Sequence, residues 1–531
     1  MTLRLALGVG SILLTGAFAP RLDAQQTVPE RTSFAQTSSH ADVLAFLDSL
    51  QARGAGIRIG TLGTSTQGRR IPYVIAARPM VDNPGDAKRS GKPVLYIQAN
   101  IHAGEVEGKD ATLRLLRDVT LGPLRSLLDS VVLLVVPIYN TDGNDAFGPS
   151  ERTRPGQNGP AIVGLRPNGQ GYDLNRDYVK QDAPETRASL AFIAAWDPDV
   201  FMDLHTTNGS YHGYALTWSP GLNANATSAN TWTQDRALPE IRRRMRTQHK
   251  FETFPYGNFR NQHPDSLRLG WDTYESVPRF GTNLMGMSRV SILSEAYSND
   301  PLERRINATH AFVVETIRHV VAQQAELRRT LAATASARPD SVVVRSTFAP
   351  PRTDTVIAEI TTAAGEGGGG FARRQRSGEM RKVVMPVIDR FVGTRRERMP
   401  AAYVLDAQWG DVVERLRRQG IAVERLGAAW TGQSMRFVVD SAVLATRAFE
   451  GHRAMRVEGQ WGTAAADSLP AGTFIIPTDQ RFGMIAAFLL EPAAEDGYTT
   501  WNFFDRAVRA RGAHPVRRLD AMPNVPREVV P

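Results

Sequence analysis

One segment constrains the fold of this chain more than any other, because a strand-like stretch leads directly into an amphipathic helix. Residues 94–100 (Val-Leu-Tyr-Ile-Gln-Ala-Asn) have the apolar character of a buried strand, and residues 106–119 have helical periodicity. His102 and Glu105 lie at the junction between the two. In open α/β sheets, ligands bind at such junctions. The segment therefore predicts an α/β fold with a functional site at the end of this strand.

The spacing of His102 and Glu105 is suited to binding a cation. Zinc accepts nitrogen and carboxylate oxygen ligands, and a catalytic zinc ion usually has three protein ligands and one open position. Short His-x-x-Glu sequences also arise by chance, so the pair alone is a weak signal. His205 follows a second strand-like stretch, residues 199–204, and is the candidate third ligand. Its competitor His212 lies in a polar, turn-like segment and is better suited to a supporting or surface position.

Three further segments combine strand or turn patterns with polar groups. They are residues 139–143 (Tyr-Asn-Thr-Asp-Gly), residues 172–178 (Tyr-Asp-Leu-Asn-Arg-Asp-Tyr) and residues 290–297 (Val-Ser-Ile-Leu-Ser-Glu-Ala-Tyr). Each has an ordinary structural explanation, such as a turn, a salt bridge or a charge at the end of a strand. Their order and spacing, taken together with the metal-binding pattern, are much harder to explain by chance.

With these segments the chain resembles the zinc carboxypeptidase family of the carboxypeptidase A and B type, over roughly residues 35–330. The resemblance implies that His102, Glu105 and His205 bind one zinc ion and that Glu295 is the catalytic glutamate. The Asn-Thr-Asp-Gly sequence in the first of the three segments is similar to the family's Asn-Pro-Asp-Gly loop, with its proline replaced.

The resemblance also implies which residues contact the substrate. Asn175 and Arg176 match the family's pair that holds the terminal carboxylate, and Arg166, nine residues before Asn175, matches an arginine that polarises the scissile carbonyl. The family has a substrate-capping tyrosine upstream of its catalytic glutamate, and Tyr274 is the nearest match. An ordinary loop tyrosine explains Tyr274 equally well. The residue at the floor of the specificity pocket has no assignment.

These residues permit hydrolysis of a peptide bond. Zinc lowers the pKa of bound water to roughly 7, and Glu295 is suited to take the water proton and pass it to the leaving amine. We therefore expect a zinc metallocarboxypeptidase that acts on peptides with a free C-terminal carboxylate. The close alternative is a zinc deacylase or amidohydrolase of the same fold, acting on N-acyl amino acids or cell-wall peptides, because such enzymes share the metal site. A non-catalytic binding protein is less favoured, because it would be expected to have lost a ligand or the glutamate.

Composition limits the chemistry and the partners. The chain contains no cysteine, so every metal ligand must be nitrogen or oxygen, which excludes zinc-finger arrangements. The net charge of +9 comes largely from scattered arginines. Basic clusters at residues 242–246 and 373–376 lack interleaved aromatic residues and any nucleic-acid-binding motif, so no nucleic-acid partner is predicted.

The first residues have the features of an export signal. Arg4 precedes an apolar stretch, residues 5–19, and Leu22-Asp-Ala24 offers a cleavage site before Gln25. The apolar stretch is shorter than the ~20 residues that cross a bilayer. We therefore predict that residues 1–24 are a signal peptide and that the protein is periplasmic or extracellular, with no membrane span after cleavage. An uncleaved anchor is the alternative.

The predicted architecture has two folded domains. Residues 25–335 should form a mixed β-sheet flanked by helices, in an α/β fold like that of the zinc carboxypeptidases. Residues 336–382, rich in Ala, Ser, Pro and Gly, are predicted to be a linker and a glycine-rich loop. Residues 383–531 begin with a strand-helix-strand pattern and should form a second, C-terminal α/β domain without catalytic groups. We expect this accessory domain to lie beside the active site and to limit access to it.

Overall fold

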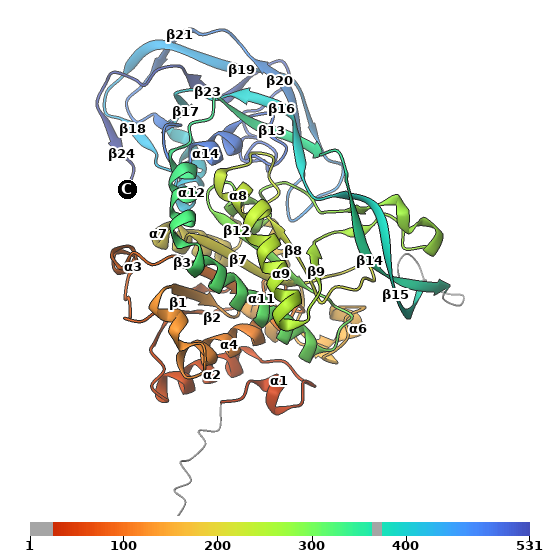
Figure 1. The fold of residues 1–531 in the computed structure, drawn as a ribbon. Helices are drawn as coiled ribbons and strands as arrows, with labels where there is room; N and C mark the ends of the chain where they lie inside the picture. The colour runs from red at the N-terminus through yellow and green to blue at the C-terminus, as the bar shows by residue number, and fades with distance from the viewer. Residues whose placement is uncertain (1–24, 364–373) are drawn as a thin grey trace, which may run out of the picture.

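The computed structural model describes residues 25–363 and 374–531. The predicted signal peptide, residues 1–24, and the glycine-rich run of residues 365–370 lie outside the described residues. An N-terminal part, drawn in red to green, and a C-terminal part from Phe391 onward, drawn in blue, lie against each other (Figure 1). Within the two described ranges, no helix combines the length and the apolar character that a bilayer crossing requires.

An eight-stranded mixed sheet forms the centre of the N-terminal part, in the order β1-β2-β4-β3-β7-β12-β8-β9. The four central strands, β4, β3, β7 and β12, run parallel, whereas β2 and β8 are antiparallel to their inner neighbours. The prediction of a mixed sheet is confirmed. The strands are β1 (Ile57–Thr64), β2 (Arg70–Ala76), β3 (Val94–Ala99), β4 (Val132–Val136), β7 (Val200–Thr206), β8 (Leu216–Pro220), β9 (Thr253–Pro255) and β12 (Val290–Ala296).

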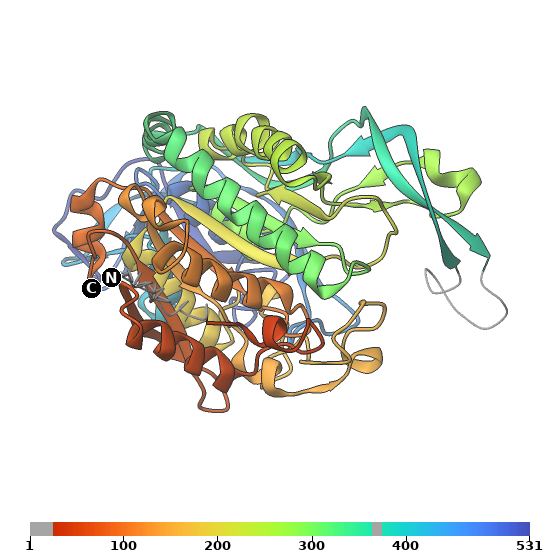
Figure 2. The same ribbon diagram turned by 60° about the horizontal axis from the view of Figure 1, so that its bottom comes forward.

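Helices cover both faces of this sheet, as predicted. Every residue of β3, β4, β7 and β12 is buried, which is typical of parallel strands covered on both sides. Figure 2 shows the long helices that cover one face of the sheet, in front of its strands. That face packs against α2 (His40–Ala52), α4 (Glu107–Thr120), α9 (Leu238–His249) and α11 (Leu302–Ala322). The opposite face packs against α7 (Pro184–Trp196) and α10 (Gly281–Gly286).

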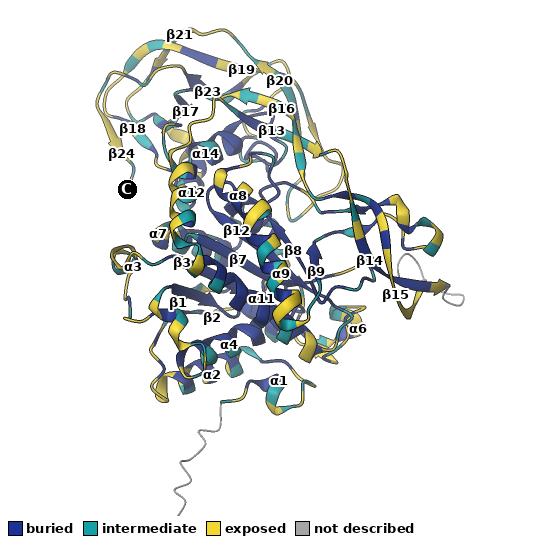
Figure 3. Ribbon diagram, viewed as in Figure 1, coloured by how far each residue is buried: buried dark blue, intermediate teal, exposed yellow. Residues whose placement is uncertain are grey.

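The described residues of the segment 336–382 do not form the linker that we predicted. After α12 (Gln324–Ser336), the chain continues into β13 (Ser341–Phe348) and β14 (Arg352–Ala363), and β15 (Arg374–Ile388) returns antiparallel to β14. The two long strands form a ribbon that projects from the body of the molecule and carries many exposed residues (Figures 1 and 3).

Alternating apolar residues explain why this region folds into strands. Val356, Ala358 and Ile360 of β14 are buried in one cluster with Trp271. Alternate residues of a strand point to the same face, so this spacing buries one face of the ribbon. The prediction of a linker rested on overall composition and overlooked this alternation of apolar residues.

The C-terminal part is richer in strands than the predicted α/β domain. Its sheet is antiparallel throughout, in the order β20-β19-β23-β17-β22-β18-β24, with β21 pairing to β19, and β16 (Phe391–Arg398) pairs with β13 outside it. Two helices accompany the sheet, α13 (Gly410–Arg418) and α14 (Gly483–Leu490). The strands are β17 (Ala402–Leu405), β18 (Glu424–Leu426), β19 (Trp430–Leu444), β20 (Met455–Trp461), β21 (Ala465–Leu469), β22 (Phe474–Pro477), β23 (Ala513–Leu519) and β24 (Arg527–Val529).

One apolar core extends through both parts of the molecule. Leu190 of α7 and Val412 of α13 belong to the same cluster of buried residues. A polar contact reinforces this junction, since the side-chain amide of Gln181 donates to the carbonyl of Arg415 at 2.9 Å. The C-terminal part is therefore packed onto the face of the eight-stranded mixed sheet that carries α7.

Candidate metal centre and active site

The ends of two adjacent parallel strands, β3 and β7, carry the predicted metal ligands. After β3, Asn100 takes a left-handed backbone conformation (φ 64°), and its side-chain amide donates to the carbonyl of Glu105 at 3.3 Å. Asparagine tolerates this conformation better than most residues. The resulting turn places His102 and Glu105 beside His205, which lies near the end of β7. Glu105 belongs to the turn, because α4 begins only two residues later.

His102, Glu105 and His205 form a compact, buried cluster. Nδ1 of His102 lies 3.1 Å from Oε1 of Glu105, and Nδ1 of His205 lies 3.0 Å from Oε2 of Glu105. The two Nδ1 atoms are 3.2 Å apart, and the three candidate ligand atoms lie within 4.8 Å of one another. Two imidazole nitrogens and one carboxylate that converge in this way suit a single zinc ion.

The outward-facing nitrogen of each imidazole ring has a carboxylate partner. Nε2 of His102 lies 3.0 Å from Oδ1 of Asp173, and Nε2 of His205 lies 3.1 Å from Oδ2 of Asp203. A carboxylate in this position keeps the proton on Nε2 and leaves the lone pair of Nδ1 for a metal ion. The donor set and its supporting carboxylates therefore fit zinc.

Arg154 contacts the cluster and was not found from the sequence. Its Nη2 lies 3.3 Å from Oε1 of Glu105 and donates to the carbonyls of Thr206 at 2.7 Å and Thr207 at 3.0 Å. Burial alone would raise the pKa of Glu105, but its electrostatic contacts with His102 and Arg154 hold it well below its usual range. Glu105 thus stays ionised, as a metal ligand must. No local pattern distinguishes Arg154 from the many other arginines of the chain.

Glu295 lies next to the metal ligands on the neighbouring strand. β12 runs parallel to β7, and in this register Glu295 stands opposite His205. The side chain is buried, and its Oε2 has no hydrogen-bond partner among the described residues. Burial raises the pKa of Glu295 to about 8. The contact with His205 lowers this pKa, and the negative charge of Glu105 raises it. A buried carboxylate with a free oxygen beside a metal site is suited to accept a proton.

The predicted substrate-binding residues Arg166, Asn175 and Arg176 line the same cavity. Nε of Arg166 donates to Oδ2 of Asp173 at 2.9 Å. The guanidinium of Arg176 lies over the ring of Phe280, 4.1 Å from its centroid, and its Nη1 donates to the carbonyl of Asn175 at 2.9 Å. The stacked guanidinium keeps further donors for a ligand, and its planar fork matches a carboxylate.

Tyr274, whose position the sequence left open, is also in the wall of this cavity. Its hydroxyl donates to Oδ1 of Asn283 at 3.3 Å, and its ring packs edge-on against Tyr256, with centroids 5.6 Å apart. Tyr256 lines the cavity too and was not identified from the sequence.

The rival metal ligand His212 lies outside the cluster. Its ring packs against Tyr297, with centroids 4.3 Å apart. Glu107, the carboxylate closest to Glu105 in sequence, forms an ion pair with Arg305 at 3.4 Å instead.

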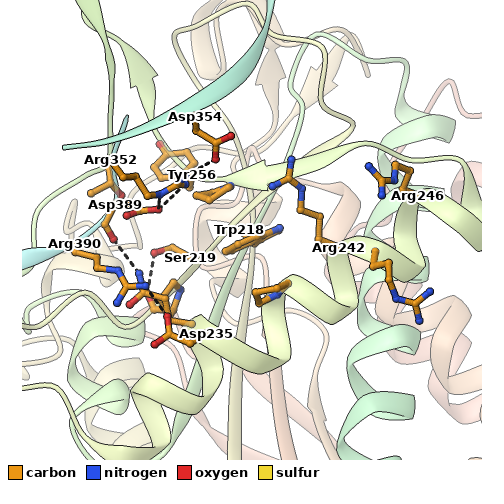
Figure 4. Close-up of a pocket in the computed structure, with 16 residues that line it drawn as sticks. Trp218, Ser219, Asp235, Arg242, Arg246, Tyr256, Arg352, Asp354, Asp389 and Arg390 are labelled. Atoms are coloured by element: carbon orange, nitrogen blue, oxygen red, sulfur yellow. Dashed lines mark hydrogen bonds and ion pairs between the residues drawn. The ribbon is translucent and has the colours of Figure 1, made fainter. Parts of the chain in front are cut away.

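All of the predicted site residues line one cavity of about 440 Å³. A second cavity, of about 560 Å³, borders the first at Tyr256, which lines both (Figure 4). Arg242 and Arg246 face this second cavity, and its described lining residues include no histidine. The groups that could bind zinc therefore belong to the smaller cavity.

Comparison with known proteins agrees with this site. The family model of the zinc carboxypeptidases matches residues 43–266. The chain carries a zinc carboxypeptidase domain. The matched segment includes the three candidate zinc ligands, whereas Glu295 lies beyond it and is placed by its strand register.

Individual relatives are distant, and some of them extend over most of the chain. Carboxypeptidase 2 of Trichophyton rubrum is 22% identical over 492 residues, which cover 86% of this chain and 81% of that protein. Carboxypeptidase D of Mus musculus is 28% identical over 160 residues, 28% of this chain and 11% of that protein. The structure of a metallo-carboxypeptidase from Burkholderia cenocepacia is 18% identical with a TM-score of 0.40, and the match covers 54% of this chain and 70% of that one. The comparisons thus place a zinc carboxypeptidase domain at residues 43–266, and the relatives that match most of the chain are named carboxypeptidases.

Proposed function

We propose that the protein is a zinc-dependent carboxypeptidase that removes the last residue of a peptide with a free C-terminal carboxylate. The supporting observation is the convergence of His102, Glu105 and His205 beside the unpartnered oxygen of Glu295 in one cavity. One zinc ion bound to these three side chains would act as a Lewis acid and lower the pKa of bound water to roughly 7.

The side chains around this centre would divide the remaining work. Glu295 accepts a proton from the attacking water as the water oxygen bonds to the carbonyl carbon. When the carbon–nitrogen bond breaks, Glu295 passes that proton to the leaving amine. Arg166 stabilises the oxyanion, and the loss of one such donor typically costs about 3 kcal/mol. Arg176 and Asn175 hold the terminal carboxylate of the substrate.

A pair of substrates tests this function. The zinc-loaded protein should hydrolyse an N-blocked dipeptide with a free C-terminal carboxylate, and the same dipeptide with an amidated C-terminus should be a much poorer substrate. The difference is expected because the amide is neutral and cannot pair with Arg176. Equal cleavage of both compounds would argue instead for the deacylase or amidohydrolase alternative, and cleavage of neither would contradict the proposal.

We also propose that the protein is exported. The charged start, the apolar stretch and the cleavage site of residues 1–24 support this. Mass spectrometry of the protein recovered from the periplasm or medium should find Gln25 as the first residue. Recovery with residues 1–24 intact would argue for the uncleaved anchor.

A further inference from the structure

The C-terminal part of the chain reaches into the cavity of the metal centre. Phe449 lines this cavity together with the candidate zinc ligands, although it is far from them in sequence. It begins a tight turn, residues 449–452, in which Phe449 and His452 exchange two backbone hydrogen bonds of 2.7 and 3.0 Å. The ring of Phe449 is thus presented by a short, internally bonded segment.

Two polar contacts fix the 449–452 turn to the catalytic part. Glu450 accepts a hydrogen bond from the backbone N–H of Asp173 at 2.8 Å, and Nε2 of His452 lies 2.7 Å from Oδ2 of Asp182. Asp173 also holds His102 through its side chain. The position of Phe449 is therefore tied to the segment that orients the metal centre.

The C-terminal part also holds Arg279, another residue of the cavity wall. The buried carboxylate of Asp496 accepts hydrogen bonds from the backbone N–H of Arg279 at 2.6 Å and from its Nη1 at 3.1 Å. The guanidinium of Arg279 lies 5.5 Å from the ring centroid of Phe280 and 5.7 Å from that of Phe449. The guanidinium of Arg176, which would bind the terminal carboxylate, is stacked on the same Phe280 ring. Phe449 therefore lies on the side of the cavity where that carboxylate would bind.

Phe449 is 42% exposed, and most of its neighbours in the cavity wall are polar or charged. An apolar side chain of a bound peptide would cover part of this ring, and each square ångström of apolar surface removed from water contributes roughly 25 cal/mol. A glycine residue would leave it uncovered.

We propose that Phe449 is a specificity-determining residue, which contacts the side chain of the C-terminal residue of the substrate and favours apolar side chains there. The proposal rests on the proposed carboxypeptidase function and adds a substrate class to it. It also gives the C-terminal part a direct role, since this part supplies a wall of the substrate site.

The test uses the full-length, zinc-loaded protein and N-blocked dipeptides that end in Phe, Leu or Gly. In Phe449→Ala, kcat/KM should fall about tenfold for the Phe and Leu substrates and stay unchanged for the Gly substrate, because only the larger side chains lose a contact. Phe449→Leu should retain most of the preference. The matched control is Phe348→Ala, since Phe348 is 41% exposed and packs against Phe391 outside the cavity.

The outcomes separate this inference from the proposed function. If the wild-type protein is active and Phe449→Ala keeps the wild-type ratio of Phe to Gly turnover, the specificity role is wrong and the carboxypeptidase function stands. An equal loss on all substrates also overturns the role. If the zinc-loaded wild type hydrolyses none of the dipeptides, the proposed function itself fails. Equal zinc content in all variants excludes a change at the metal centre.

Discussion

The carboxylate of Asp173 supports several groups of the candidate site at once. Its Oδ1 accepts from the backbone N–H of Asn175 at 2.9 Å and lies 3.0 Å from Nε2 of His102, while its Oδ2 accepts from Arg166. One side chain thus orients a proposed zinc ligand and the proposed oxyanion-binding arginine. Supporting carboxylates of this kind raise the basicity of a histidine ligand and fix its ring.

Replacing Asp173 should therefore weaken metal binding. Asp173→Asn removes the negative charge beside His102, and we expect zinc affinity to fall about 10–100-fold. Competition with a zinc chelator measures this. The control is Asp340→Asn, which alters an exposed carboxylate outside the cavity and should leave affinity unchanged. Equal zinc affinity in both variants would show that Asp173 does not support the ligand.

The role of Glu295 can be separated from metal binding. Glu295→Gln keeps the size of the side chain but cannot accept the water proton, so kcat/KM should fall by at least about 10²-fold. Zinc content should match that of the wild type, because Glu295 is not one of the three ligands. Near-normal activity with zinc bound would mean that another group is the base.

The environment of Glu295 also predicts a pH dependence. Burial raises its pKa to about 8, from an ordinary value of 4.5, and a divalent cation nearby would lower that pKa by favouring the charged form. Since only the ionised carboxylate accepts a proton, kcat/KM should rise with pH. The midpoint of the rise should lie between those two values. A pH–rate profile with a midpoint at or below 4.5 would contradict this assignment.

At the scale of elements, the approach of α4 to β7 brings the ligands together. Gly108 lies in the first turn of α4, and a Cβ atom there would lie 2.8 Å from Cβ of Leu204 and 3.3 Å from Cβ of Ala99. Leu204 directly precedes His205. A side chain at position 108 would therefore force the helix that follows Glu105 away from the strand that carries His205.

Two glycine-to-alanine changes test this packing. Gly108→Ala should destabilise the fold by about 1–2 kcal/mol, even though alanine favours helices, because the contact with Leu204 is too short to absorb a methyl group. It should also weaken zinc binding. Gly410→Ala, at the start of α13, meets no atom within 4 Å and should be neutral or stabilising by up to about 1 kcal/mol. Thermal unfolding and chelator titration give both quantities, and equal effects in the two variants would refute the argument.

The sequence predicted those features that depend on local pattern. The strand ends that carry His102, His205 and Glu295 have their own apolar signals, and all three lie in one cavity. Arg154 and Phe449 were missed because their contacts form only between segments that are distant along the chain. The ribbon of β14 and β15 was mistaken for a linker because its composition hid an alternating apolar pattern.

At the scale of the whole molecule, the shared core makes the two parts interdependent. Leu190 and Ile193 of α7 are buried in a cluster that includes residues of both parts. A protein that ends at residue 335 would expose them to water, and fully burying one such side chain is worth about 1.5–3 kcal/mol. We expect this shortened chain to be insoluble or to lack a cooperative thermal transition. A soluble, zinc-binding and active fragment of residues 25–335 would show that the catalytic part is independent.

The pairing of β7 with β12 has a consequence for how such an enzyme can change. His205 and Glu295 occupy paired positions on two adjacent hydrogen-bonded strands. The sheet, and not a loop, therefore sets the spacing between these two groups. The 449–452 turn, in contrast, belongs to the surrounding wall and carries neither of these two groups. Substitutions in the wall of the cavity could thus change substrate specificity during evolution, while the spacing of His205 and Glu295 stays the same.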